Sequence, residues 1–235
     1  MPHLILFDID GTLVLTGGAG SRAMTRAFRD VFLVDDAFRG IPMPGRTDPH
    51  IVADAVARAG LTPDGALLSR FRERYGECLR EAIREPGPRK GVLPGVRPLL
   101  GALYARPDVF LALLTGNYAD AARVKLEYFD LWRYFSCGAY GDEAPDRQQL
   151  VPIAVERARA CGAHAAALER VVVVGDTPLD VACAHSAGAI AVGVATGGHS
   201  TRELAGSGAD VVFEDLSDTP RFLALVDDGF RRATR

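Results

Sequence analysis

Residues 4–12 read Leu4-Ile5-Leu6-Phe7-Asp8-Ile9-Asp10-Gly11-Thr12, and this segment is the most informative part of the chain. Its first four residues form a short apolar run, which is typical of a strand buried on both faces of a parallel sheet. Because alternate residues of an extended chain point to the same face, we expect Asp8 and Asp10 to converge on one site. Gly11 then allows the backbone to turn away from the strand direction.

Four further apolar runs share the character of the first one. They alternate with segments of helical length, and this alternation predicts an α/β fold with a doubly wound parallel sheet. The runs cover 109–114, 171–174, 190–194 and 211–213, and the predicted helices cover 119–129, 150–161, 179–187 and 200–205.

The region from Gly17 to Arg89 departs from this alternation. It contains no convincing strand, and its apolar residues at helical spacing predict three helices, at 19–33, 50–59 and 65–85. We therefore expect an α-helical cap domain at 17–89, inserted into an α/β core formed by 1–16 and 90–235. The chain rejoins that core through a segment rich in Gly and Pro at 86–95.

The composition excludes several classes of protein. The chain has 235 residues, of which 48% are hydrophobic and 24% charged, values typical of a folded globular protein. Its formal net charge is −3, so the chain lacks the excess of basic residues that is typical of nucleic-acid-binding proteins. The longest stretch without Asp, Glu, Lys or Arg, 181–201, is too polar to span a membrane. We therefore expect neither nucleic acid nor membrane as a partner. Because the first residues do not resemble a signal peptide, we expect a cytoplasmic location.

Polar residues follow a second predicted strand at the edge where ligands bind in open α/β sheets. Thr115-Gly116-Asn117 comes after 109–114 and precedes a predicted helix. A hydroxyl group and the free N–H groups of a helix N-terminus suit a phosphate. The alternative is an ordinary N-cap, since Thr and Asn both cap helices well.

A third polar segment, Gly175-Asp176-Thr177-Pro178-Leu179-Asp180, follows the strand predicted at 171–174. Pro178 is expected in the first helical turn, which places Asp180 near a helix N-terminus where a carboxylate is stabilised. Asp176 has no such local role and is a candidate metal ligand. Close carboxylates such as Asp8 and Asp10 need a cation or a shared proton, and oxygen ligands suit Mg²⁺. The alternative for these aspartates is a turn role, with hydrogen bonds to nearby backbone.

In order and spacing, these three segments resemble the motifs of the haloacid dehalogenase-like (HAD) superfamily of hydrolases. The matches are DIDGT at 8–12, Thr115, and GDTPLD at 175–180. The resemblance implies that Asp8 is a nucleophile that forms an aspartyl-phosphate. It implies that Asp10 protonates the leaving oxygen and then activates water.

The same resemblance implies a metal and phosphate site. Mg²⁺ would be bound by Asp8, by the backbone carbonyl of Asp10 and by Asp176. Thr115, with the neighbouring Gly116 and Asn117, would hold the phosphoryl oxygens. Asp180 would support the metal ligands or a basic residue.

The sequence departs from the family at that basic residue. Family members commonly have a lysine between the second and last motifs, and the only lysine in this interval is Lys125. Lys125 lies on the helix predicted directly after Thr115, so we expect it to lie away from the site. Arg147 is the expected replacement, because arginine also neutralises carboxylate and phosphate groups. The alternative for Arg147 is a solvated surface charge.

Gly45-Arg46-Thr47-Asp48-Pro49 links two predicted cap helices, and its position resembles the specificity loop of such caps. Arg46 is a candidate for pairing with an anionic group of the substrate. Asp48 and Pro49 are expected as the N-cap and the first residue of the next helix, so Asp48 is interpreted as structural.

These features predict a Mg²⁺-dependent phosphomonoesterase that acts on a small phosphorylated metabolite. Within the family, the chain resembles the phosphoglycolate phosphatase subgroup. A sugar-phosphate mutase and a non-catalytic binding or regulatory member of the fold are the alternatives. We expect the protein to be a monomer or a homodimer.

Overall fold

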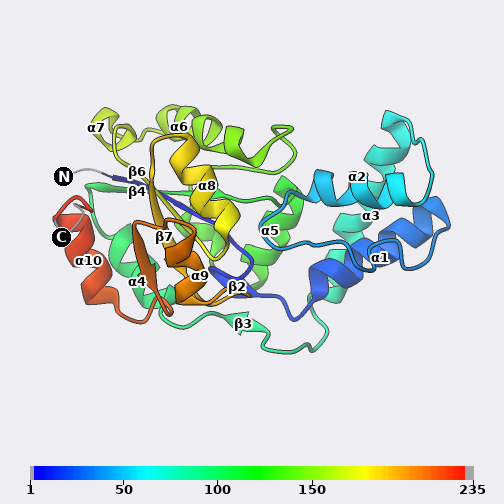
Figure 1. The fold of residues 1–235 in the computed structure, drawn as a ribbon, viewed down its shortest axis with the longest axis horizontal. Coiled ribbons are helices and arrows are strands. Elements are labelled where there is room, and N and C mark those ends of the chain that lie inside the picture. Colours follow the sequence, from blue (N-terminus) through cyan, green and yellow to red (C-terminus); the bar gives the residue numbers. More distant parts are fainter. Residues whose placement is uncertain (1–2, 231–235) are drawn as a thin grey trace.

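The computed structural model describes residues 3–230 and consists of an α/β core with a helical region beside it (Figure 1). The core sheet has six strands in the order β5-β4-β1-β6-β7-β8, and all neighbouring strands are parallel. β1 (His3–Phe7) lies between β4 (Val109–Leu114) and β6 (Val171–Gly175). The other strands are β5 (Gly138–Ala139), β7 (Ile190–Val194) and β8 (Val211–Phe213).

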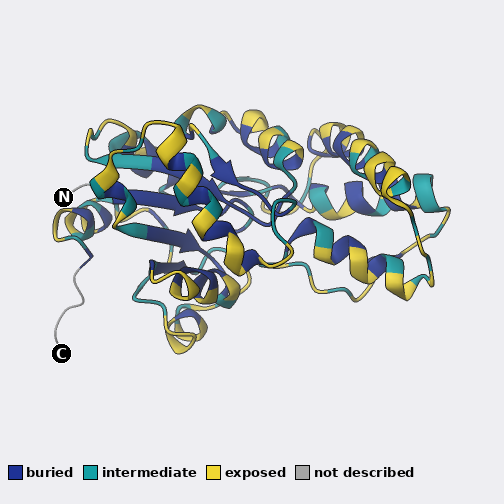
Figure 2. Cartoon of the chain, turned by 90° about the horizontal axis from the view of Figure 1, so that it is seen from above, coloured by how far each residue is buried: buried dark blue, intermediate teal, exposed yellow. Residues whose placement is uncertain are grey.

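Helices cover both faces of this sheet because its strands are apolar on both faces (Figure 2). Leu4 and Leu6 of β1 share a buried cluster with α6 (Leu150–Ala160) and α8 (Pro178–Ser186). Ile5 and Phe7 face the opposite way, towards α4, α5 and α10. These three helices cover Val96–Tyr104, Ala119–Tyr128 and Thr219–Asp227. The predicted doubly wound α/β fold is therefore confirmed.

The helical region consists of α1 (Ala19–Phe32), α2 (Asp48–Arg58) and α3 (Gly65–Ala82). Its buried side chains belong to the same cluster as one face of the core sheet. Aromatic packing joins two of the helices, since the rings of Phe28 and Phe71 form an edge-to-face pair with centroids 5.9 Å apart. The three helices predicted in this part of the chain are thus present.

Two short strands join the helical region to the core. β2 (Val14–Leu15) pairs in antiparallel fashion with β3 (Gly91–Val92). Just beyond this pair, Gly17 and Gly87 pass so closely that a Cβ on Gly87 would clash with the Gly17 carbonyl oxygen. The two connections therefore run side by side, and they fix where α1 begins relative to the core (Figure 1).

Some elements were not predicted. α4 contains Pro98 and Gly101 and begins after Gly95, whose φ of +77° requires glycine, so its sequence has the composition of a loop. Strand β5 has only two residues, and α7 (Ala165–Leu168) has four. The helix predicted at 200–205 is present as α9 (Thr201–Gly206), and Ser200 and Glu203 form a capping box there.

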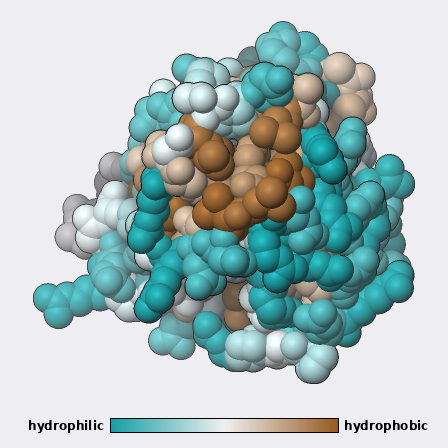
Figure 3. Space-filling model, turned by 90° about the vertical axis from the view of Figure 1, so that its right-hand side faces the viewer, coloured by the Kyte–Doolittle hydropathy of each residue, from teal (hydrophilic) through white to brown (hydrophobic). Residues whose placement is uncertain are grey.

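The outer end of the helical region carries apolar side chains on its surface, surrounded by hydrophilic ones (Figure 3). Leu33 at the end of α1 is 86% exposed, and Phe32, Val34, Ile41 and Leu61 are half-buried. Such a patch is typical of an interaction surface. Within residues 3–230, no helix has both the length and the apolar character needed to cross a membrane.

Candidate active site

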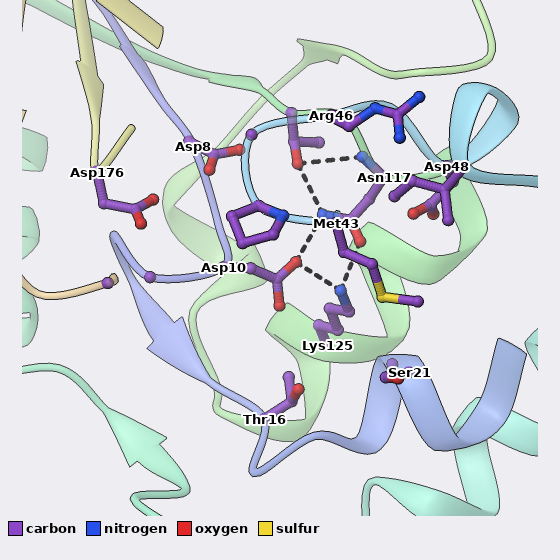
Figure 4. Close-up of a pocket in the computed structure, with 18 of the residues that line it drawn as sticks. Asp8, Asp10, Thr16, Ser21, Met43, Arg46, Asp48, Asn117, Lys125 and Asp176 are labelled. Carbon is purple, nitrogen blue, oxygen red and sulfur yellow. Dashed lines mark hydrogen bonds and ion pairs between the residues drawn. The ribbon is translucent and has the colours of Figure 1, made fainter. Parts of the chain in front are cut away.

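The carboxyl ends of β1, β4 and β6 form one side of a pocket between the core and the helical region (Figure 4). The pocket has a volume of about 330 Å³. Asp8 and Asp10 line it after β1, Thr115 after β4 and Asp176 after β6. Adjacent parallel strands thus bring together the three polar segments that are far apart in the sequence.

Three buried carboxylates gather at the deep end of the site. Asp8, Asp176 and Asp180 each offer an oxygen atom that lies within 4.8 Å of the others. Burial raises the pKa of Asp8 to about 7 and that of Asp176 to about 9, and the charges of neighbouring carboxylates add to both rises. The cluster therefore favours a bound cation or bound protons.

This donor set fits a hard divalent cation such as Mg²⁺, because it offers only oxygen atoms and an excess of buried negative charge. Both oxygens of Asp180 are already engaged, Oδ2 by the backbone N–H of Thr177 at 3.0 Å and Oδ1 by Arg147. Asp8 and Asp176 are therefore the better ligands of the three. The resemblance implies that Asp10 contributes its backbone carbonyl, and its side chain points towards Lys125.

The backbone around Asp176 is shaped by glycine and by the helix start that follows. Gly11 has a φ of +86°, and a Cβ at this position would clash with the Asp176 carboxylate. The hydroxyl of Thr12 donates to Asp176 Oδ1 at 3.3 Å. Thr177 and Asp180 form a capping box at the start of α8, as expected for a carboxylate near a helix N-terminus.

Arg147 lies inside the carboxylate cluster and is 7% exposed, so it is not a solvated surface charge. Its Nη2 is 3.3 Å from Asp8 Oδ1 and also pairs with Asp180. Its Nη1 donates to the carbonyl oxygen of Gly45 at 2.8 Å. Arg147 therefore supplies a buried positive charge between Asp8 and Asp180.

Lys125 also lies in the pocket, and the expectation that it lies elsewhere is wrong. Its Nζ is 2.5 Å from Asp10 Oδ2 and 2.5 Å from Asn117 Oδ1. The helix α5 buries one face, formed by Ala121, Ala122, Lys125 and Leu126. A lysine within the apolar face of a helix was the sequence signal that could have identified it.

Asn117 connects this lysine to the second motif. Its Nδ2 donates to Asp10 Oδ2 at 2.9 Å and to Thr115 Oγ1 at 2.8 Å. Two of the N–H groups expected to be free at the start of α5 have partners, however. The Tyr118 and Ala119 N–H groups donate to the carboxylates of Asp48 and Asp142, at 2.8 Å and 3.3 Å.

Asp48 does not serve as the predicted N-cap of α2. That position is occupied by Thr47, whose hydroxyl accepts from the His50 N–H, and Asp48 is the first helical residue. Its buried carboxylate instead crosses to the core and caps α5 at Tyr118. Burial raises the pKa of Asp48 to about 7, although the charge of Lys125 opposes the rise.

Arg46 lines the pocket, but its guanidinium is directed away from Asp8 and Asp10 (Figure 4). It pairs with Asp54 of α2 at 2.7 Å and donates to the Pro42 carbonyl at 3.2 Å. The backbone of this loop packs on Gly116, where a Cβ would clash with the Arg46 carbonyl oxygen. The loop at 45–47 therefore approaches the site mainly through its backbone.

Comparisons with known proteins agree with this geometry. A family model described as HAD-hydrolase-like matches residues 151–219. A phosphoglycolate phosphatase from Rhodospirillum rubrum is 32% identical, and the alignment covers 97% of this chain and 94% of that protein. A phosphoglycolate phosphatase from Chromobacterium violaceum is 28% identical, over 91% of this chain and 93% of the other.

Solved structures show the same fold. The crystal structure of a hydrolase from Pseudomonas syringae superposes with a TM-score of 0.68 at 23% identity, and the match covers 96% of this chain and 99% of that one. The full-length relatives indicate one family of hydrolases. The parallel sheet, the helical region after the first strand and the three polar segments at one sheet edge fit that assignment. The chain therefore belongs to the haloacid dehalogenase-like (HAD) hydrolases, and its full-length relatives in that family are phosphatases.

Proposed function

We propose that the protein is a Mg²⁺-dependent phosphomonoesterase that hydrolyses a small phosphorylated metabolite through an aspartyl-phosphate on Asp8. The observation that carries this proposal is the contrast between two neighbouring aspartates of the pocket. Asp8 is buried and contacts Arg147, whereas the Asp10 side chain is 42% exposed and contacts Lys125 and Asn117. Two carboxylates in different environments suit two different catalytic roles.

Asp8 is suited to be the nucleophile. Arg147 contacts its Oδ1 at 3.3 Å, which leaves Oδ2 as the oxygen that attacks phosphorus. The attack forms a bond from Oδ2 to phosphorus and breaks the bond from phosphorus to the alcohol oxygen. A second attack by water on the phosphorus of the aspartyl-phosphate releases phosphate and regenerates the carboxylate.

Asp10 is suited to be the acid and base. Its carboxylate is accessible in the pocket and is held by Lys125 and Asn117. As the acid it donates a proton to the departing alcohol oxygen, and as the base it accepts a proton from the attacking water. The two contacts fix its orientation, and proton transfer depends strongly on orientation.

The metal and phosphate contacts complete the proposal. Asp8, Asp176 and the Asp10 carbonyl would hold Mg²⁺, which supplies positive charge next to the phosphoryl oxygens when it is bound. The Thr115 hydroxyl and the residues Gly116 and Asn117 line the same pocket and are the proposed phosphoryl contacts. Asp180 supports the site by holding Arg147.

We further infer that residues 17–89 act as a cap. The pocket lies between these residues and the core, so the cap supplies the wall against which the alcohol portion packs. The names of the curated relatives make 2-phosphoglycolate the first ester to assay.

The test is phosphate release from a panel of small phosphomonoesters that includes 2-phosphoglycolate, in Mg²⁺ and in EDTA. We expect Mg²⁺-dependent turnover that Asp8→Asn lowers by roughly 10⁴-fold or more. Asp35→Asn, at an exposed aspartate outside the pocket, is the matched control and should retain turnover. Turnover that persists unchanged in Asp8→Asn would refute the proposed nucleophile.

A further inference from the structure

The half of the pocket formed by the helical region differs in chemistry from the half that holds the aspartates. Its wall contains the side chains of Met24, Met43, Ile51 and Tyr75. Met24 and Ile51 are 3% exposed and Tyr75 is 1% exposed, so packing holds them in place. They come from α1, α2 and α3, and Met43 comes from the segment before α2.

We propose that this wall selects phosphate monoesters whose alcohol portion is uncharged and partly apolar, over esters that carry a second anionic group. The inference rests on the proposed function, because it places the phosphoryl group at Asp8. The rest of the ester then occupies the half of the pocket lined by Met24, Met43 and Ile51. Apolar side chains stabilise apolar carbon there and offer no partner to a charge.

The cations of the pocket already have carboxylate partners. Arg147 pairs with Asp8 and Asp180, and Lys125 pairs with Asp10. Arg46 pairs with Asp54 and extends away from the site (Figure 4). Arg89 is the other cation among the described residues that line the pocket, and it is exposed, so solvent screens its charge.

A carboxyl group strengthens this selectivity. Asp48 lines the pocket one helical turn before Ile51, on the same side of α2, and is buried. A second anionic group of a substrate would therefore lie near Asp48 and among apolar side chains. Burying a charge that has no partner is costly, so binding of such an ester is disfavoured.

Uncharged polar groups are nevertheless available to the alcohol portion. Thr16 and Ser21 line the pocket around the start of α1 (Figure 4). The hydroxyl groups of Thr16, Ser21 and Tyr75 can each donate and accept a hydrogen bond. The wall thus suits an alcohol that combines apolar carbon with an uncharged hydroxyl or amide.

The test compares three esters in the presence of Mg²⁺: 2-phosphoglycolate, its carboxamide analogue and n-butyl phosphate. The carboxamide matches phosphoglycolate in size and lacks the second charge. We expect kcat/KM to be roughly tenfold or more higher for the carboxamide and for the butyl ester than for phosphoglycolate. Most of the difference should lie in KM, because the wall acts on binding.

Two variants at one position test the role of the wall. Met43→Lys places a cation there and should raise kcat/KM for phosphoglycolate relative to the carboxamide by about tenfold. Met43→Leu keeps the wall apolar and should keep the wild-type ranking. Met43 is half-buried and lies outside the helices, so both side chains can be accommodated.

Binding to Asp8→Asn, measured by calorimetry with the same three esters, gives the ranking without turnover. If the wild type hydrolyses none of the esters, the proposed function fails, and the binding ranking still decides the selectivity. A preference for phosphoglycolate over its carboxamide, equal binding of the two, or no binding would overturn the inference. If the wild type prefers phosphoglycolate and Arg89→Ala does not, Arg89 is the partner of the second anionic group and the inference is overturned.

Discussion

Lys125 Nζ lies 2.5 Å from Asp10 Oδ2, although the two residues are 115 positions apart in the chain. Lys125 projects from the buried face of α5, and Asp10 follows the central strand β1. Asn117 contacts both residues, which closes a small network of one carboxylate, one amide and one ammonium group. The orientation of Asp10 is therefore set by α5, whereas that of Asp8 is set by Arg147.

The first prediction concerns this network. Lys125→Met keeps the length of the side chain and removes the charge, so Asp10 loses its strongest positioning contact. We expect kcat to fall by roughly 100-fold, with a smaller change in KM, because a misplaced acid costs about that much. Steady-state kinetics measure the effect. Lys90→Met is the matched control, since Lys90 contacts Ile83, Glu85 and Tyr128 outside the pocket, and it should retain kcat.

The second prediction concerns Arg147. Arg147→Ala leaves the buried carboxylates of Asp8 and Asp180 without their cation, and breaking such a buried pair typically costs about 3–5 kcal/mol. Arg147→Lys keeps the charge but loses the forked guanidinium that reaches Gly45, Asp8 and Asp180 together. The Lys variant should therefore lose less stability and less activity than the Ala variant. Urea unfolding and kcat/KM, both in Mg²⁺, measure the two effects. Equal values for the Lys and Ala variants would contradict the role of the charge.

Much of the fold could be predicted because the strands carry their own signal. The apolar runs at β1, β4, β6, β7 and β8 differ clearly from the helical segments, and polar residues mark the strand ends. α4 and α10 were missed because Gly95 and Pro98 at the start of α4 and Pro220 at the start of α10 give these segments the composition of loops. Tertiary packing, rather than local composition, makes these segments helical.

The site was harder to predict where the contacts cross between elements. Asp8, Asp10, Thr115 and Asp176 were assigned from their strand ends, which the sheet brings together. The pairing of Asp48 with the N–H of Tyr118, across 70 positions, has no local signal, and a capping role for Asp48 at its own helix was the simpler interpretation. Arg46 was a candidate for substrate binding because its loop resembles a specificity loop. Its pairing with Asp54 depends on the path of that loop, which the sequence does not reveal.

The third prediction follows from the burial of Asp48. Burial raises the pKa of this carboxyl to about 7 in the folded protein, well above its ordinary value of 3.8. Its contribution to stability is therefore fully present below about pH 4 and is lost as pH rises through about 7. Asp48→Asn still accepts the Tyr118 N–H but does not titrate, so its free energy of unfolding should fall less over this range. Urea unfolding at a series of pH values compares it with Asp54→Asn, at a more exposed aspartate of the same helix, which should follow the wild type.

The fourth prediction joins metal and pH at the carboxylate cluster. Burial raises the pKa of Asp8 to about 7 and that of Asp176 to about 9, so the folded protein without metal binds more protons than the unfolded chain between about pH 4 and pH 9. In EDTA its stability should therefore fall as pH rises through this range. Mg²⁺ binds the ionised carboxylates, so its stabilising effect should be larger near pH 9 than near pH 6.

Thermal unfolding in EDTA and in MgCl₂, at matched ionic strength, measures both effects. Asp176→Asn removes the carboxylate with the more strongly raised pKa, so this variant should show a flatter dependence of Tm on pH in EDTA and little response to Mg²⁺. Asp35→Asn should keep the wild-type dependence and response, because Asp35 is exposed and lies outside the cluster. A Mg²⁺ response that is equal at the two pH values, or that survives in Asp176→Asn, would place the metal at other ligands. Because the readout is stability, the result holds whichever ester the protein hydrolyses.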